Sequence, residues 1–156
     1  MTSDKFKNLI VRPARLSDCR ACQRLGRVLE IAIAPGWYLP LEYYQQIIRH
    51  RQIFQVAVIK NKIMGFVIGE SIVAGVLIQY IVVAKSYRRQ GISQKLLRVL
   101  ENIARQRGAY FLLSYGVVKS PGIQRSFAKL GYRRGQLAQE WMKGLTPQPP
   151  PRKIRD

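Results

Sequence analysis

The sequence predicts a single α/β domain built on a mixed β-sheet. Two apolar runs separated by a turn at Lys60, Asn61 and Lys62 predict an antiparallel hairpin, and a third apolar run follows directly. A long stretch with helical periodicity comes next, and a further strand follows it. An antiparallel meander that continues into β-α-β units indicates a sheet with strands of both directions. We expect about six or seven strands, flanked by about four helices.

Two helices separate the first strand from the hairpin. Residues 9–11 form a short apolar strand that closes at Pro13, because proline cannot continue a central ladder. Ser17 is the expected N-cap of the first helix, whose apolar stripe extends to Ile33. A second apolar stripe over residues 41–50 predicts a short second helix.

The remaining elements alternate between strands and helices. We expect strands over residues 53–59, 63–70, 76–83, 109–115 and 138–143. We expect helices over residues 92–108 and 124–130. Gly108 suits the C-terminal cap of the longer helix. We therefore expect one domain over residues 1–145, followed by a proline-rich basic tail, 146–156, that is disordered.

The composition is that of a globular protein. Of the 156 residues, 47% are hydrophobic, and a chain of this length buries roughly two-thirds of the surface that its unfolded form exposes. Residues 1–8 lack the apolar run of a secretory signal, and the most apolar stretch, residues 72–84, is too short to span a bilayer. We expect a cytoplasmic protein without a membrane span.

Cys19 and Cys22 are the two cysteines of the chain, and their spacing is also that of zinc and redox pairs. A zinc site needs about four ligands, and His50 is the sole histidine. The favoured interpretation is that both thiols lie on one face of the first helix as small apolar groups. No metal site is expected.

The net charge is the outlier of the composition. The chain has 27 Lys and Arg against 8 Asp and Glu, which gives +19. Such a field attracts nucleic acid, acidic proteins or a polyphosphate cofactor, and composition does not choose among them. Because basic residues but no acidic ones lie between Asn102 and Gln139, we expect the positive face mainly in the C-terminal half.

Residues 88–93 have the features of an anion-binding loop. They join a strand to a helix, and a helix N-terminus presents unpaired amides and a partial positive charge to pyrophosphate. Gly91 lets the backbone approach the phosphate, and Arg88 and Arg89 add charge. Taken alone, the same residues are also those of a solvated turn.

This loop resembles the acyl-CoA signature of the GNAT superfamily of N-acyltransferases, in which Arg or Gln, two residues, Gly, one residue, and Gly or Ala open a helix. Arg88, Gly91 and Ser93 occupy those positions, with serine as a less usual last residue. Residues 11–18 resemble the family's opening strand and helix start, and residues 127–132 resemble its later helix and turn. The resemblance covers residues 8–143.

The resemblance implies a GNAT-like fold, with a central mixed sheet that splays between the strands ending at Val83 and Tyr115 and holds acetyl-CoA in the gap. Pantetheine would pair with strand backbone, and an amide near Val83 would stabilise the oxyanion. A primary amine would attack the thioester directly, without a metal. The residues implied for cofactor binding are Ile81, Val82, Val83, Arg88, Arg89, Gln90, Gly91, Ile92 and Ser93.

Two residues are our candidates for the chemistry itself. An attacking amine must be neutral, so the site needs a base, and Glu70 is the carboxylate of the predicted central sheet. The alternative is that Glu70 is a surface residue at the end of the hairpin. The tyrosine that often serves the family as an acid is Phe127 here, which leaves Tyr115 as the candidate, with Tyr110 and water as alternatives.

Other readings of the sequence stay open. Gln79 and Tyr80 either line the acceptor site or pack in a strand, and Tyr43 and Tyr44 either wall that site or pack on the sheet. The charge also suits a nucleic-acid- or ribosome-associated module on the same scaffold, and Phe127 suits a non-catalytic acyl-CoA sensor. The acceptor, a protein or a small molecule, is not predicted, although the charge disfavours a free polycation. The oligomeric state is not predicted either.

Overall fold

A five-stranded sheet forms the centre of the structure. The computed structural model describes residues 8–28, 38–115 and 121–135, in which the strands lie in the order β1-β2-β3-β4-β5. They are β1 (Ile10–Pro13), β2 (Ile53–Ile59), β3 (Lys62–Ile72), β4 (Gly75–Val83) and β5 (Phe111–Ser114). The first four pair antiparallel and β5 pairs parallel with β4, so the sheet is mixed, as predicted. The predicted strand 138–143 and tail 146–156 lie outside the described residues.

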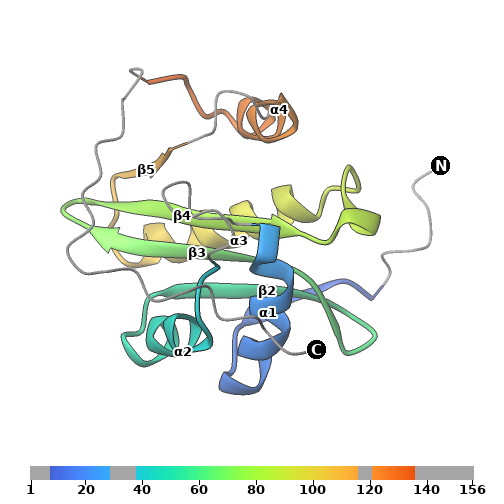
Figure 1. Ribbon diagram of the computed structural model, residues 1–156. Coiled ribbons are helices and arrows are strands. Elements are labelled where there is room, and N and C mark those ends of the chain that lie inside the picture. The colour runs from blue at the N-terminus through green and yellow to red at the C-terminus, as the bar shows by residue number, and fades with distance from the viewer. Residues whose placement is uncertain (1–7, 29–37, 116–120, 136–156) are drawn as a thin grey trace.

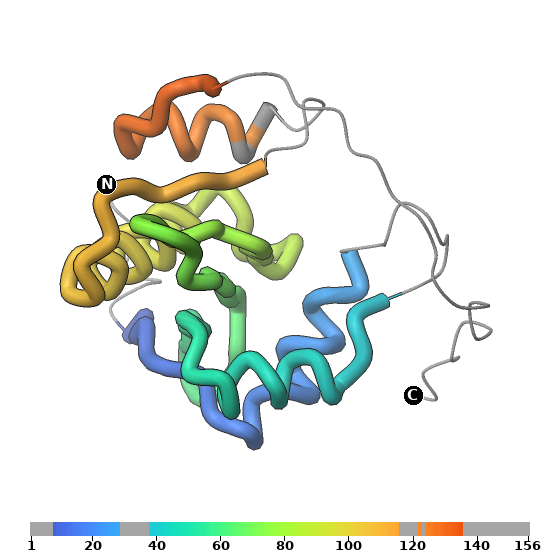
Figure 2. The backbone as a smooth tube through the Cα atoms, turned by 90° about the vertical axis from the view of Figure 1, so that its left-hand side faces the viewer, coloured from blue at the N-terminus to red at the C-terminus, as the bar shows by residue number. Residues whose placement is uncertain are grey.

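Helices cover both faces of this sheet (Figure 1, Figure 2). They are α1 (Cys19–Leu25), α2 (Leu41–Arg49), α3 (Ile92–Gln106) and α4 (Pro121–Lys129), with short 3-10 turns η2 (Leu16–Asp18), η3 (Gly26–Val28) and η4 (Lys85–Tyr87). α3 packs on one face, and α1 and α2 pack on the other. In the described parts of the chain, no helix is long and apolar enough to cross a membrane.

Each face of the sheet has its own apolar core. On one face, the inward stripe of α3 is fully buried against the strands: Ile92, Leu96, Leu97, Leu100 and Ala104. On the other face, Tyr44 of α2 packs edge-on against Phe66 of β3, with ring centroids 5.9 Å apart. Burial of each large apolar side chain contributes about 1.5–3 kcal/mol, so these two cores fix the positions of the helices.

The first helix is shorter than predicted. It ends at Leu25 and continues into η3, and the predicted part beyond residue 28 lies outside the described residues. A Cβ on Gly26 would lie 2.0 Å from the Tyr44 hydroxyl oxygen. The residue at the end of α1 therefore has to be glycine for α2 to approach this closely.

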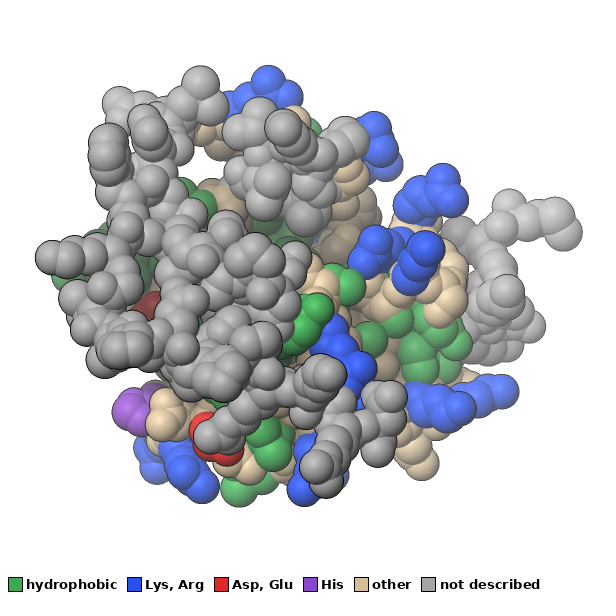
Figure 3. Space-filling view, viewed as in Figure 1, with side chains coloured by type: hydrophobic (Ala, Val, Ile, Leu, Met, Phe, Trp, Pro, Cys, Tyr) green, Lys and Arg blue, Asp and Glu red, His purple; other side chains and the backbone are tan. Residues whose placement is uncertain are grey.

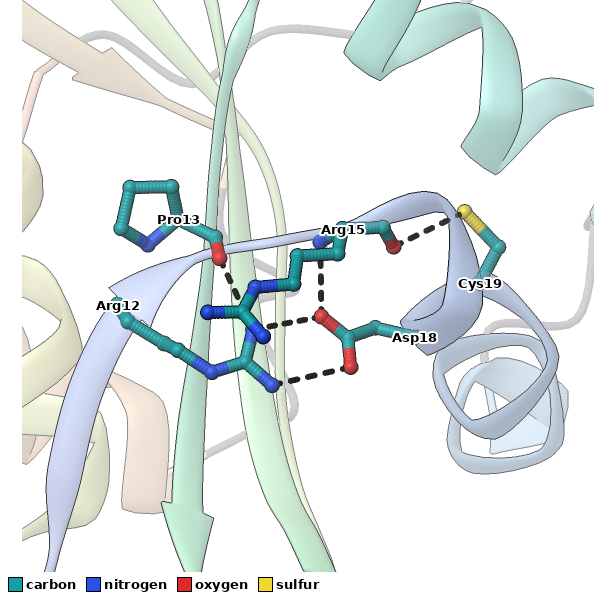
Figure 4. A network of polar contacts seen from close by, with 5 residues as sticks. All are labelled: Arg12, Pro13, Arg15, Asp18 and Cys19. Atoms are coloured by element: carbon teal, nitrogen blue, oxygen red, sulfur yellow. Dashed lines mark hydrogen bonds and ion pairs between the residues drawn. The ribbon is translucent and has the colours of Figure 1, made fainter. Parts of the chain in front are cut away.

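The predicted cap at Ser17 is wrong. Ser17 lies inside η2, and the carboxylate of Asp18 accepts the Arg15 N–H at 2.7 Å instead. Arg12 donates to both carboxylate oxygens of Asp18, at 2.7 and 3.1 Å (Figure 4). These bonds to Arg12, helped by the Arg15 N–H, hold the pKa of Asp18 below its ordinary value, although burial acts in the opposite direction. Asp18 thus ties the end of β1 to the start of the first helix.

A β-bulge in β4 changes which side chains face α3. The register pairs Ile68 with Tyr80 and then Gly69 with Ile78, so Gln79 has no directly opposite residue on β3. Ile78 belongs to the core under α3, whereas Tyr80 packs against the core under α1 and α2. Without the bulge these two residues would share one face of the sheet.

Candidate active site

The sheet splays between β4 and β5, as predicted. The parallel ladder starts with the pair of Gly75 and Phe111 and ends with the pair of Ile78 and Ser114. β4 continues beyond that pair to Val83 with no β5 residue opposite it in the described chain. Among the residues that the structure describes, the last part of β4 therefore has one edge without a strand partner.

That edge presents the backbone of Ile81 and Val83. The Ala84 N–H donates to the Met64 carbonyl at 2.8 Å across β3 and β4. Because hydrogen-bonded and non-hydrogen-bonded pairs alternate along antiparallel strands, the N–H and C=O groups of Val83 and Ile81 point away from β3. In agreement, the Val83 carbonyl accepts a hydrogen bond from Arg88 Nε at 3.1 Å.

The loop after β4 leaves the N-terminus of α3 open. Arg89 and Gly91 have φ angles of 60° and 81°, in the left-handed region, and Gly91 is the N-cap residue of α3. No side chain of the described residues caps this end, so the first amides of the helix lack an intrahelical partner. A Cβ on Gly91 would have no atom within 4 Å, so the space beside the loop is open. These features suit a phosphate anion.

The predicted cofactor residues lie in two adjoining groups. Residues 81–83 end β4, and residues 88–93 form the loop and the first turn of α3. Val82 and Ile92 are 4% and 1% exposed, so their side chains anchor the two groups. The Val82 backbone pairs with Phe66 of β3, so of these two residues only Ile92 has an amide that can face a ligand. The arrangement fits a pyrophosphate at the loop and an extended chain along β4.

A chain of hydrogen bonds links α2 to β3 through the bulge. The Tyr43 hydroxyl donates to Gln79 Oε1 at 2.8 Å, and Gln79 Nε2 donates to Glu70 Oε2. Glu70 is partly buried, on the same side of the sheet as this chain. Because the amide accepts at one end and donates at the other, its orientation is fixed, and Glu70 is held as a hydrogen-bond acceptor.

Aromatic rings enclose this chain. The Tyr43 ring meets Tyr44 and Tyr80 edge-on, with centroids 5.7 and 6.1 Å apart. Burial raises the pKa of Tyr43, and the neighbouring Tyr80 and Glu70 raise it further. The Tyr43 hydroxyl therefore stays protonated at neutral pH, as its role as a donor requires.

Tyr115 does not contact Glu70. It follows β5 and is 72% exposed, and β4 lies between β5 and the strand that carries Glu70. Two strand spacings amount to roughly 10 Å, so the two candidate catalytic residues meet only through a molecule bound between them.

Phe127 leaves no hydroxyl at the position of the usual acid. It lies on α4, and its ring packs against Tyr132 with centroids 4.8 Å apart. Burial raises the pKa of Tyr132, and the neighbouring Glu101 raises it further. The Phe127 and Tyr132 pair is therefore an apolar contact under α4.

The cysteines are structural, as expected. Cys19 and Cys22 are completely buried, and burial is the main cause that raises the pKa of each thiol. Across the residues that the structure describes, no three His, Cys, Asp or Glu side chains gather as metal ligands.

The hydrogen bonds that join Gln79 and Tyr43 to Glu70 are not predicted by the sequence. Sequence pattern leaves both residues as lining or packing residues, because their connection to Glu70 depends on the bulge. A signal was present in Gly69, since a glycine inside a strand suggests a bulge or a close approach. A Cβ on Gly69 would lie 2.9 Å from a Leu100 methyl carbon.

The fold is shared with solved N-acetyltransferases. An N-acetyltransferase from Staphylococcus aureus Mu50 has 17% identity and a TM-score of 0.73, over 83% of this chain and 86% of that one. A ribosomal-protein-alanine N-acetyltransferase from Brucella melitensis has 18% identity and a TM-score of 0.69, over 78% and 83%. The aminoglycoside N-acetyltransferase AAC(6')-Iy, in complex with CoA, has 15% identity and a TM-score of 0.74, over 87% and 95%. No curated protein matches the sequence.

The sequence also matches a family model directly. The model described as the acetyltransferase (GNAT) family covers residues 23–132, which include the β4 edge, the loop and α3. This span is more than half of the chain, and its architecture agrees with the mixed, splayed sheet. The chain is therefore an acyltransferase of the GNAT acetyltransferase family, whose members use acetyl-CoA.

Proposed function

We propose that this protein transfers the acetyl group of acetyl-CoA to a primary amine by direct attack, with Glu70 as the base. One observation carries the proposal: the chain of Tyr43, Gln79 and Glu70 meets β4 at Gln79, directly after the residue where the β4–β5 ladder ends. The base and the open edge of β4 thus adjoin.

The loop and the open edge of β4 would hold the two parts of acetyl-CoA. Amides at the start of α3, with Arg88 and Arg89, suit the pyrophosphate. The outward backbone groups of Ile81 and Val83 suit the amides of pantetheine. The Val83 N–H is our candidate donor to the oxyanion, because it points away from β3 at the end of that edge.

Glu70 would take the proton of the attacking amine. Gln79 binds Glu70 Oε2, and we assign Oε1 to the amine, directly or through one water. The amine nitrogen forms a bond to the thioester carbon, the carbon–sulfur bond breaks, and the sulfur leaves as a thiolate. Tyr115, exposed after β5, or solvent returns a proton to that thiolate.

The charge of the chain narrows the class of acceptor. Among the structural neighbours, one is named for a ribosomal-protein alanine and another for an aminoglycoside. An aminoglycoside is a polycation, and a chain of net charge +19 repels it. We therefore favour a neutral or acidic acceptor, such as the α-amino group of a protein or peptide.

The test is acceptor-dependent thiol release with acetyl-CoA, run with peptides that begin with alanine, a neutral small amine and an aminoglycoside. We expect release with a peptide or the neutral amine, accompanied by an acetylated product in mass spectrometry. Release only with the aminoglycoside would overturn the acceptor class. Tight acetyl-CoA binding without release for any acceptor would favour a sensor over an enzyme.

A further inference from the structure

Six cations gather at one end of the sheet, where β4 and β2 end and α3 begins. Lys60 and Lys62 flank the turn between β2 and β3, and Lys85 follows β4. The Ala84 N–H bond to Met64 brings the end of β4 beside the start of β3. Lys95, in the first turns of α3, donates to the Leu9 carbonyl next to β1 at 2.9 Å. We call this surface the basic end; it consists of Lys60, Lys62, Lys85, Arg88, Arg89 and Lys95.

No acidic side chain of the described residues compensates the charge of the basic end. All six side chains are exposed, and none forms an ion pair within the part of the chain that the structure describes. The four carboxylates of the described chain lie elsewhere. Asp18 pairs with Arg12 beyond the far end of β1, and Glu70 lies at the far end of β3. Glu42 is in the first turn of α2, and Glu101 lies toward the C-terminal end of α3, beside Arg105. Along β3, Glu70 is about 26 Å from Lys62 at the usual rise per residue.

Figure 3 shows where charged side chains lie on one face. Several lysine and arginine side chains lie on its right-hand side, over the end of the sheet where β4 terminates, and others lie at the lower left; the visible acidic side chains lie to the left. The basic end comes from residues 60–95, and four of its six cations lie in the second half of the chain, ahead of the basic stretch between Asn102 and Gln139.

We propose that the basic end binds the phosphate backbone of a nucleic acid, in addition to the cofactor. Four lysines remain after Arg88 and Arg89 are assigned to pyrophosphate, and pyrophosphate alone does not require them. Evenly spread cations without an apolar centre are typical of contacts to a phosphate backbone.

The surface is less suited to the other polyanionic partners. A protein interface is expected to have buried aromatic anchors, and a membrane-binding surface an apolar face. Of the described residues, Ile10 is the one exposed large apolar side chain beside the basic end. Ile72, Val73, Tyr110 and Phe111 are exposed at the far end of β3 or beside it. The proposed partner is therefore recognised by charge, without base-specific contacts.

The test measures binding of a labelled single-stranded RNA of about 20 nucleotides, a length that spans several phosphate contacts. It uses the full chain with coenzyme A at saturation, so that Arg88 and Arg89 are occupied. If four lysines contact phosphates, log K falls with log salt with a slope of roughly −3. We expect binding to persist in the presence of coenzyme A.

Two variants with the same net charge separate local from global effects. Lys60→Glu with Lys62→Glu removes the turn lysines, and Arg20→Glu with Arg24→Glu changes the charge equally on α1, on the other face of the sheet from α3. We expect the lysine variant to weaken RNA binding roughly tenfold and to flatten the slope by about 1.4, and the arginine variant to change both far less. Lys60→Gln with Lys62→Gln removes the positive charge of the turn without adding negative charge, and should weaken RNA binding less than the glutamate variant does.

Three results would overturn the proposal. Equal weakening in both charge-reversal variants would mean that only net charge matters. Complete displacement of RNA by coenzyme A would reduce the basic end to the cofactor site. Equally tight binding of polyglutamate, or of vesicles rich in anionic lipid, would replace nucleic acid with another partner.

Discussion

The Gln79 side chain donates a hydrogen bond to Glu70 from the bulge in β4, and α2 fixes the orientation of that amide through Tyr43. The two residues are nine positions apart in sequence and come together because the bulge removes Gln79 from the ladder with β3. In this arrangement Glu70 takes the proton in our proposal, and Gln79 and Tyr43 position Glu70.

Removal of the Tyr43 hydroxyl should slow acetyl transfer without weakening the binding of acetyl-CoA. In Tyr43→Phe the Gln79 oxygen loses its donor and the amide is held at one end only, so Glu70 is positioned less firmly; we expect kcat to fall roughly tenfold, with a changed pH profile and unchanged affinity for acetyl-CoA. Tyr44→Phe is the control, because the buried Tyr44 hydroxyl has no hydrogen-bond partner among the described residues. Equal effects of the two variants on kcat would show that Tyr43 only packs.

Two glycines with the same backbone geometry separate strain from cofactor binding. Gly91 and Gly108 have φ angles of 81° and 76°, so alanine at either position should lower the free energy of unfolding by about 1–2 kcal/mol. Only Gly91→Ala should also weaken the binding of acetyl-CoA, roughly tenfold, because it disturbs the amides at the start of α3. Calorimetric titration of both variants checks this, and an equal loss of affinity in Gly108→Ala would remove the loop from the account.

Asp18 should stabilise the fold except in acid. Because its pKa in the folded chain is below the ordinary 3.8, the contribution of the Arg12 pair is complete above that value and is lost as the pH falls through the lower folded pKa. Asp18→Asn should lower the free energy of unfolding by about 2 kcal/mol near neutral pH, and the difference from the natural chain should shrink below pH 3.8.

Glu101→Gln is the control for that experiment. Glu101 lies 3.9 Å from Arg105, whose side chain is 71% exposed, so we expect a change of no more than about 0.5 kcal/mol. Urea unfolding at several pH values compares the two. A pH-independent difference for Asp18→Asn would contradict the ion-pair assignment.

Tyr115 should contribute little to the rate. It is 72% exposed, and a thiol with an ordinary pKa of about 8.5 leaves as a thiolate without a strong acid. Tyr115→Phe should therefore lower kcat less than tenfold, whereas an obligatory acid is worth about 10²–10⁴. Steady-state thiol release decides between these values, and a hundredfold loss would make Tyr115 the essential acid.

Local patterns in the sequence predicted most of the described elements and the position of the loop before α3. The spacing of Ile92, Leu96 and Leu100 alone indicated the buried face of α3, and Gly91 indicated the turn before it. The bulge at Gln79 could not be predicted in this way, because it depends on the register between two strands. Likewise Asp18, and not Ser17, orders the first helix, since its partner Arg12 belongs to the preceding strand.

The central claim is that the loop and Glu70 are two halves of one site, and it is tested most directly by measuring acetyl-CoA affinity and the single-turnover rate of acetyl transfer on the same variants. Gly91→Asp places bulk and negative charge against the pyrophosphate, and should abolish affinity. Glu70→Gln should bind acetyl-CoA as the natural chain does, and transfer its acetyl group more slowly by a factor of about 10²–10⁴. Transfer at an unchanged rate in Glu70→Gln, or unchanged affinity in Gly91→Asp, would contradict the account.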